Sequence, residues 1–147
     1  MGRTLGLDVG ERRIGVALSD PTGTIASPLT VMPAAPRTCL GGELERICRE
    51  REVERIVVGL PVCLDGTEGS AARQAREFAR WVADVTGRPV ELWDERLTTA
   101  EAERAMIAGG MRRDRRREAI DKVAAQILLQ CYLDRHAAPP PESGPPP

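Results

Sequence analysis

Aromatic residues make up only 3% of the 147-residue chain, and lysine and histidine occur once each, as Lys122 and His136. A core with so few aromatic rings must be built from Val, Ile, Leu and Ala. No apolar run reaches the roughly 20 residues that a membrane-spanning helix needs. The chain also enters a strand pattern at once, without a leader segment. We therefore expect a cytoplasmic protein with no membrane association.

Paired cysteines are missing as well, because none of Cys39, Cys48, Cys63 and Cys131 belongs to a C-x-x-C motif. This spacing argues against a zinc site, and a single histidine cannot complete one. Cys48 and Cys131 fall on the apolar faces of helical patterns, so we expect them to be buried free thiols.

The net charge of −1 excludes a surface that attracts nucleic acid as a whole, so such a site must come from local clusters of cations. All but one of the 21 cationic residues are arginines, which bind phosphate through a planar, bidentate guanidinium. Two clusters are present. The first follows the opening strand pattern and the second precedes the last helix: Arg12 and Arg13, then Arg112, Arg113, Arg115, Arg116 and Arg117.

The chain length suits one domain with one core. We place this domain at residues 1–136 and expect the proline-rich residues 137–147 to form a disordered tail. Strand patterns at 4–9, 13–19 and 24–32 predict antiparallel hairpins, and Pro28 assigns the third strand to a sheet edge. Helical patterns at 40–50 and 68–85 alternate with strand patterns at 55–60 and 90–93, and a last helix covers 115–135. The predicted fold class is α/β, with a five-stranded mixed sheet and helices on both faces.

The helical patterns also predict which side chains face the core. These are Ala71, Ala75, Phe78 and Val82 in the helix at 68–85, and Ile120, Val123, Ala124, Ile127, Leu128 and Cys131 in the last helix. Thr98 and Glu101 fit a capping box that opens a further helix, which should end at Gly109-Gly110.

Three acidic residues stand where this fold would bring carboxylates to one edge of the sheet. Asp8 lies in the first strand, Glu95 follows the fifth, and Asp121 lies near the start of the last helix. A carboxylate in a buried strand costs several kcal/mol unless something compensates it. A hard divalent cation with oxygen ligands provides that compensation. A carboxylate cluster that holds such a metal is suited to cleaving a phosphodiester bond.

Each acid also has a structural explanation. Asp8 could bond turn amides, or belong to an Asp-x-Gly phosphate loop like that of actin-like kinases, although those enzymes need two such domains. Glu95 could belong to a solvated, internally paired loop, as charge runs such as Asp94-Glu95-Arg96 usually do. It shares one side of its strand with Trp93 while Asp94 lies on the other, so alternation leaves open which acid faces the site. Asp121 could compensate the helix dipole, which contributes up to about 1 kcal/mol.

Four motifs in order carry a resemblance to a known family. They are Asp8-Val-Gly-Glu-Arg-Arg-Ile-Gly-Val-Ala-Leu-Ser-Asp20, Gly59-Leu-Pro61 with Asp65-Gly-Thr-Glu-Gly69, Asp94-Glu-Arg-Leu-Thr-Thr99, and Asp121-Lys-Val-Ala-Ala-Gln-Ile-Leu-Leu129. Together they resemble the YqgF/RuvX family of the ribonuclease H-like superfamily, whose members are described as Holliday-junction resolvases and as nucleases that mature precursor 16S rRNA. The resemblance implies that Asp8, Glu95 and Asp121 hold two Mg²⁺ or Mn²⁺ ions, with Asp94 as the fallback for Glu95. It also implies products with 5′-phosphate and 3′-hydroxyl ends.

The sequence thus predicts a metal-dependent endonuclease that acts on structured RNA, in rRNA processing, or on branched DNA. The two arginine clusters would position the backbone of the substrate strand. The loop at residues 65–70 could bind a phosphate at a helix N-terminus or serve as a simple cap. Two other hypotheses stay open: a non-catalytic nucleic-acid-binding module and an actin-like phosphotransferase. Junction resolution would in addition require a homodimer, with two sites facing two strands.

Overall fold

The computed structural model describes residues 2–61, 66–95 and 113–136, with side chains from Val123 onward in the last range. The elements in these ranges are β1 (Arg3–Val9), β2 (Arg13–Ser19), β3 (Ala26–Pro33), α1 (Arg37–Glu50), β4 (Val53–Leu60), α2 (Ser70–Thr86), β5 (Val90–Asp94) and α4 (Arg113–His136). The predicted capping box at 98–101, the helix end at Gly109-Gly110 and the tail at 137–147 lie outside the described residues. None of the helices in the described ranges is long and apolar enough to cross a membrane.

The five strands form one mixed sheet in the order β3-β2-β1-β4-β5. β1 pairs antiparallel with β2, and β2 with β3, because short turns connect them. β4 pairs parallel with both β1 and β5, and α1 and α2 lie between these strands in the chain. This topology confirms the predicted fold class. The strand that contains Pro28 is an edge strand, as expected.

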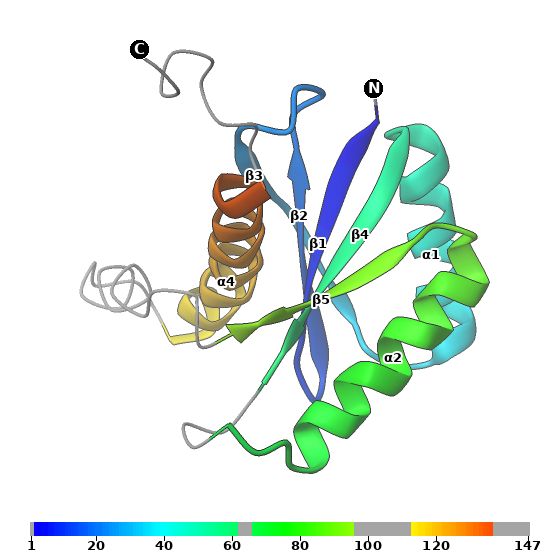
Figure 1. Ribbon diagram of the computed structural model, residues 1–147. Coiled ribbons are helices and arrows are strands. Elements are labelled where there is room, and N and C mark those ends of the chain that lie inside the picture. Colours follow the sequence, from blue (N-terminus) through cyan, green and yellow to red (C-terminus); the bar gives the residue numbers. More distant parts are fainter. Residues whose placement is uncertain (1, 62–65, 96–112, 137–147) are drawn as a thin grey trace.

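Helices cover both faces of the sheet. α4 lies on one face, and α1 and α2 lie on the other (Figure 1). Successive strand residues point to opposite faces and therefore enter two different cores. Leu7 and Val16 belong to the core beneath α1 and α2, whereas Ala17, Val57 and Trp93 belong to the core beneath α4. The central strands are consequently apolar on both faces.

α4 approaches the sheet closely because β1 carries a glycine at the contact. A Cβ atom added to Gly6 would lie 2.8 Å from Leu129 Cβ. Two glutamines then attach α4 to β3. Gln126 Nε2 donates to the carbonyl oxygen of Ala26 at 3.1 Å, and Ala26 N donates to Gln130 Oε1 at 2.8 Å. Together these contacts fix the height and the rotation of α4 over the first hairpin.

The predicted inner faces of two helices were partly wrong. In α2, Ala75, Phe78 and Val82 are buried as predicted, but Ala71 is exposed and Ala72 is buried in its place. In α4 the buried side chains are Ala125, Leu128, Leu129, Tyr132 and Leu133, whereas Val123, Ala124, Ile127 and Cys131 are only half-buried. The α4 sequence is apolar on more than one side, so periodicity alone does not determine which side meets the sheet. The close contact with Gly6 does determine it.

The three cysteines that the structure describes are free thiols. Cys48 is buried, as predicted, Cys131 is half-buried and Cys39 is exposed. Burial raises the pKa of the Cys48 thiol to about 11. Cys63 lies outside the described residues.

Candidate active site

Asp8 stands on the α4 face of the sheet, near the carboxyl end of β1. It is half-buried and pairs across the hairpin with Gly15 of β2. On the other side, β1 pairs with β4 up to Leu7 opposite Val58, so the next residue of β4, Gly59, comes beside Asp8. Both lateral neighbours of Asp8 are therefore glycines. Neither of the two strand positions that flank Asp8 on its own face carries a side chain.

Glu95 directly follows β5 and lies on the same face of the sheet. Two residues earlier, Trp93 is buried against Tyr132 of α4, with ring centroids 5.9 Å apart in an edge-on arrangement. A Cβ atom added to Gly59 would lie only 2.4 Å from Glu95 Oε2. The Glu95 carboxylate thus occupies the space above Gly59, next to the strand position of Asp8.

Asp94 belongs to the opposite face of the sheet. Leu92, two residues earlier in β5, shares the face of Asp94 and packs against the cores beneath α1 and α2. The ambiguity that alternation left between Glu95 and Asp94 is resolved in geometric terms, because Glu95 is the acid on the side of Asp8. The catalytic role of Glu95 stays a prediction.

Asp121 lies in the part of α4 whose backbone the structure describes and whose side chains it does not. Its position precedes Ala125 by four residues and Leu128 by seven, and both of these side chains are buried against the sheet. Residues at such spacings share one face of a helix. Position 121 therefore belongs to the sheet-facing side of α4, one turn before Ala125 and about two turns before Leu128 and Leu129, which cover Gly59 and Gly6. The contribution of its carboxylate to the site stays a prediction.

The donor set suits a hard divalent cation. Asp8 and Glu95 supply carboxylate oxygens, the ligand type that Mg²⁺ and Mn²⁺ take in proteins. Gly59 leaves a space that a Cβ atom would fill, and a carboxylate enters it. The structure describes the side chains of two of the three predicted ligands, Asp8 and Glu95. Among all the side chains that it describes, no group of three or more His, Cys, Asp or Glu residues could hold a metal ion.

The first arginine cluster lies in the turn that follows Asp8. Gly10 N donates to the Arg13 carbonyl oxygen at 2.9 Å, and a Cβ atom on Gly10 would lie 2.8 Å from that oxygen, so the tight turn requires glycine. Ala34 N donates to the Arg12 carbonyl oxygen at 2.9 Å, which fixes the turn against the end of β3. The exposed Arg12 and half-buried Arg13 are therefore held beside the carboxyl end of β1.

The second cluster is largely outside what the structure describes. Arg112 lies outside the described residues, and Arg113, Arg115, Arg116 and Arg117 lie in the first turns of α4, where side chains are not described. In the loop before α2, Asp65 is also outside, and Gly69 is the N-cap residue without a side-chain cap. The predicted roles of this cluster and of the loop stay predictions.

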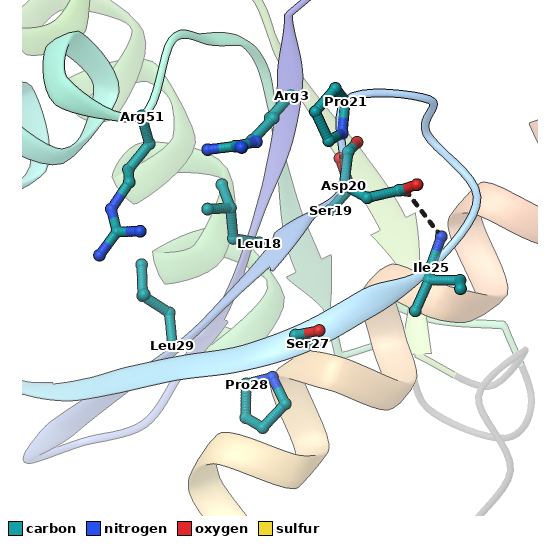
Figure 2. A pocket seen from close by; sticks show the side chains of 10 residues that line it. All are labelled: Arg3, Leu18, Ser19, Asp20, Pro21, Ile25, Ser27, Pro28, Leu29 and Arg51. Carbon is teal, nitrogen blue, oxygen red and sulfur yellow. Dashed lines mark hydrogen bonds between the residues drawn. The ribbon is translucent and has the colours of Figure 1, made fainter.

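A hollow of about 370 Å³ lies at the opposite end of β1 and is not part of this site (Figure 2). Arg3 and Arg51 line it over a floor that includes Leu18 and Leu29. Glu50 and Glu52 line an adjoining hollow that shares both arginines, so acids offset the two cations. The region therefore lacks the excess positive charge that would attract a phosphate.

Asp20, at the rim of the 370 Å³ hollow, has its own role in the β2–β3 turn. Its carboxylate accepts hydrogen bonds from Ile25 N at 2.9 Å and Thr24 N at 2.8 Å, and one from the hydroxyl of Thr22. These bonds, the one from Ile25 above all, lower the pKa of Asp20 to about 2. The acid stabilises the turn and has no connection to Asp8.

Comparison with solved structures defines the class. RuvC from Thermus thermophilus, solved in complex with a Holliday junction substrate, superposes with a TM-score of 0.57 at 15% identity, covering 95% of this chain and 99% of that one. The Holliday junction resolvase of fowlpox virus gives a TM-score of 0.50 at 11% identity, covering 90% and 99%. The chain thus has the ribonuclease H-like fold of the RuvC-type resolvases.

Sequence comparison then gives the family. Residues 2–135 match the family described as RuvX, Holliday junction resolvase. A protein of Symbiobacterium thermophilum is 48% identical over 138 residues, covering 94% of this chain and 96% of the relative. A protein of Pelotomaculum thermopropionicum is 45% identical over 143 residues, covering 97% and 93%. Both carry the name "Putative pre-16S rRNA nuclease". The chain belongs to the RuvX family, which confirms the predicted relationship and the prediction of a nuclease.

Sequence reasoning found the acids and included Gly59 in a family motif, but it did not connect this glycine with the space that Glu95 occupies. Apart from that motif, the signal for such a role was a glycine inside the otherwise apolar strand pattern at 55–60. Glycine in a strand interior weakens the strand and often marks the close approach of another group.

Proposed function

We propose that this chain is a divalent-metal-dependent endonuclease that hydrolyses phosphodiester bonds in structured nucleic acid, with precursor 16S rRNA and branched DNA as its candidate substrates. Membership of the RuvX family and the names of the relatives support the reaction class. The observation that carries the proposal is the position of the Glu95 carboxylate above Gly59, next to Asp8 on the α4 face. The relatives are bacterial, and we expect the chain to act in the cytoplasm, where both substrates are found.

Asp8, Glu95 and Asp121 would hold two Mg²⁺ or Mn²⁺ ions. When bound, the metal supplies an activated water nucleophile and neutralises charge on the reacting phosphate. The protein contributes the position of the oxygens: Asp8 is fixed by the pairing of β1 with both neighbouring strands. Glu95 is held in place by the burial of Trp93.

The arginines would bind the substrate backbone rather than read its bases. Arg12 and Arg13 stand beside the carboxyl end of β1, and the cluster at 112–117 precedes the sheet-facing part of α4. Such contacts release counterions, so affinity should fall steeply as salt concentration rises. Replacing one exposed arginine, as in Arg12→Gln, should reduce the salt dependence by about one phosphate contact.

The decisive experiment compares cleavage of a four-way DNA junction and of precursor 16S rRNA by the wild type and by Asp8→Asn, Glu95→Gln and Asp121→Asn, each with Mn²⁺. All three variants should lose activity while keeping the wild-type fold. Asp94→Asn is the matched control, because it removes the neighbouring charge on the opposite face and should stay active. Full activity in Asp8→Asn would end the assignment, and loss of activity in Asp94→Asn alone would transfer the role from Glu95 to Asp94.

The same preparation can identify the substrate. A junction resolvase must cut two strands, so cleavage of the junction should require a homodimer with two sites. Precursor rRNA needs only one cut at a time and can be processed by a monomer. Measuring the oligomeric state on the junction and mapping the product ends separates these cases. Metal-independent binding without cleavage of either substrate would instead indicate a non-catalytic binding module.

A further inference from the structure

We propose that Gly59 is a positioning residue, whose missing side chain allows the Glu95 carboxylate to lie beside Asp8. The inference rests on the proposed role of Glu95 as a metal ligand. Glu95 Oε2 and Cδ would lie 2.4 Å and 3.1 Å from a Cβ atom on Gly59, so carboxylate and methyl group cannot occupy this space together. Trp93 of β5 pairs with Gly59 of β4, and its side chain is buried in the core beneath α4 on the same face. A methyl group at position 59 would therefore displace the Glu95 carboxylate from its present place above β4.

The contacts at Gly59 differ in kind from the helix contact at Gly6. At Gly6 the added atom would meet Leu129 Cβ and the Ala125 carbonyl oxygen, which cannot move without the helix. At Gly59 it would meet two side-chain ends, Glu95 Oε2 and Leu128 Cδ1, the latter at 2.5 Å. Both ends can rotate away while the backbone stays in place. Gly59→Ala should therefore leave the fold intact and disturb the site.

Packing against α4 is the competing explanation for a glycine at this position. Leu128 is buried, and its methyl group fills part of the space above Gly59. If packing were the only reason, a methyl group at 59 would affect stability alone. If Gly59 positions the carboxylate, metal affinity must change as well, and only while Glu95 is present. Residues that orient metal ligands typically contribute 10–100-fold to metal affinity.

The test measures Mn²⁺ affinity, from the electron paramagnetic resonance signal of unbound Mn²⁺, and thermal stability in the same samples. The proteins are the full-length wild type, Gly59→Ala, Glu95→Ala and the double variant, which together form a double-mutant cycle. Gly59→Ala should bind Mn²⁺ about 10–100-fold more weakly than the wild type. In the Glu95→Ala background it should have no further effect. Gly42→Ala is the control, because a Cβ atom there meets nothing within 4 Å.

Two results would overturn the inference: wild-type Mn²⁺ affinity in Gly59→Ala, or an equal loss of affinity with and without Glu95. Should Gly59→Ala fail to fold, Gly59→Ala combined with Leu128→Ala removes the helix contact and keeps the carboxylate contact. This variant should fold and still bind Mn²⁺ weakly, and restored affinity would assign Gly59 to packing. Unchanged Mn²⁺ affinity in Glu95→Ala would refute the proposed role of Glu95 as a metal ligand. The other outcomes do not affect that proposal.

Discussion

Replacing Gly6 by alanine should push α4 away from the sheet and destabilise the protein. The added Cβ atom would lie 2.8 Å from Leu129 Cβ. This is about 1 Å short of the roughly 3.5–4.0 Å separation that two carbon atoms prefer. Because both atoms are bonded directly to backbone, the helix must retreat, and overpacking of this kind costs about 1–3 kcal/mol. The reduced entropy of the unfolded chain would offset only about 0.4–1 kcal/mol of this cost.

Urea unfolding of Gly6→Ala, followed by far-UV circular dichroism, measures the effect as a lower midpoint with an unchanged slope. The melting temperature should fall by several degrees, at about 2–4 °C per kcal/mol for a domain of this size. Gly42→Ala provides a control of opposite sign. Gly42 lies on the exposed side of α1 with nothing within 4 Å, so alanine there should stabilise the helix by about 0.8–1 kcal/mol. A Gly6→Ala midpoint at or above that of the wild type would refute the close contact between β1 and α4.

Three further outcomes follow from the structure. The pKa of Asp20 in the folded state is about 2, below its ordinary 3.8, so the stability that Asp20 contributes is complete above about pH 4 and is lost as the pH falls toward 2. Asp20→Asn should remove this pH dependence from the acid-unfolding curve. An unchanged curve would contradict the hydrogen bonds of the turn. In the native protein, iodoacetamide should modify the exposed Cys39 and spare the buried Cys48, whose thiol pKa is raised to about 11. Peptide mapping by mass spectrometry measures both reactions, and faster modification of Cys48 than of Cys39 would contradict the prediction. Tyr132→Phe should lower the free energy of unfolding by about 1 kcal/mol, because the Tyr132 hydroxyl donates a hydrogen bond to Glu91 and accepts one from Arg55. An unchanged free energy of unfolding in chemical denaturation would mean that these hydrogen bonds contribute nothing to stability.

Local sequence signals predicted the strands well. The turn at Gly10 and the proline in β3 each act within a few residues, and the hairpins and the edge strand are found as expected. The rotation of α4 was predicted poorly because it depends on a contact between Gly6 and Leu129, which are far apart in the sequence. An apolar stripe indicates that a helix is buried, but a helix with two such stripes needs its partner to select one.

The candidate site shows the same division. Alternation along β5 reduced the choice to Asp94 or Glu95, and the packing of Trp93 on Tyr132, a long-range contact, assigns Glu95 to the face of Asp8. The role of Gly59 escaped prediction for a different reason. A missing side chain produces no periodic pattern, and its importance depends on which atom of a distant residue enters the space.

The attachment of α4 to β3 has a consequence for protein synthesis. Gln126 and Gln130 bond to Ala26, about a hundred residues earlier in the chain. On the ribosome, the first hairpin leaves the exit tunnel long before its covering helix has been translated. One side of the nascent sheet must stay bare until α4 has been translated. A nuclease built in this order acquires its proposed carboxylate at position 121 long after the one at position 8, so its site cannot assemble before α4 has been made.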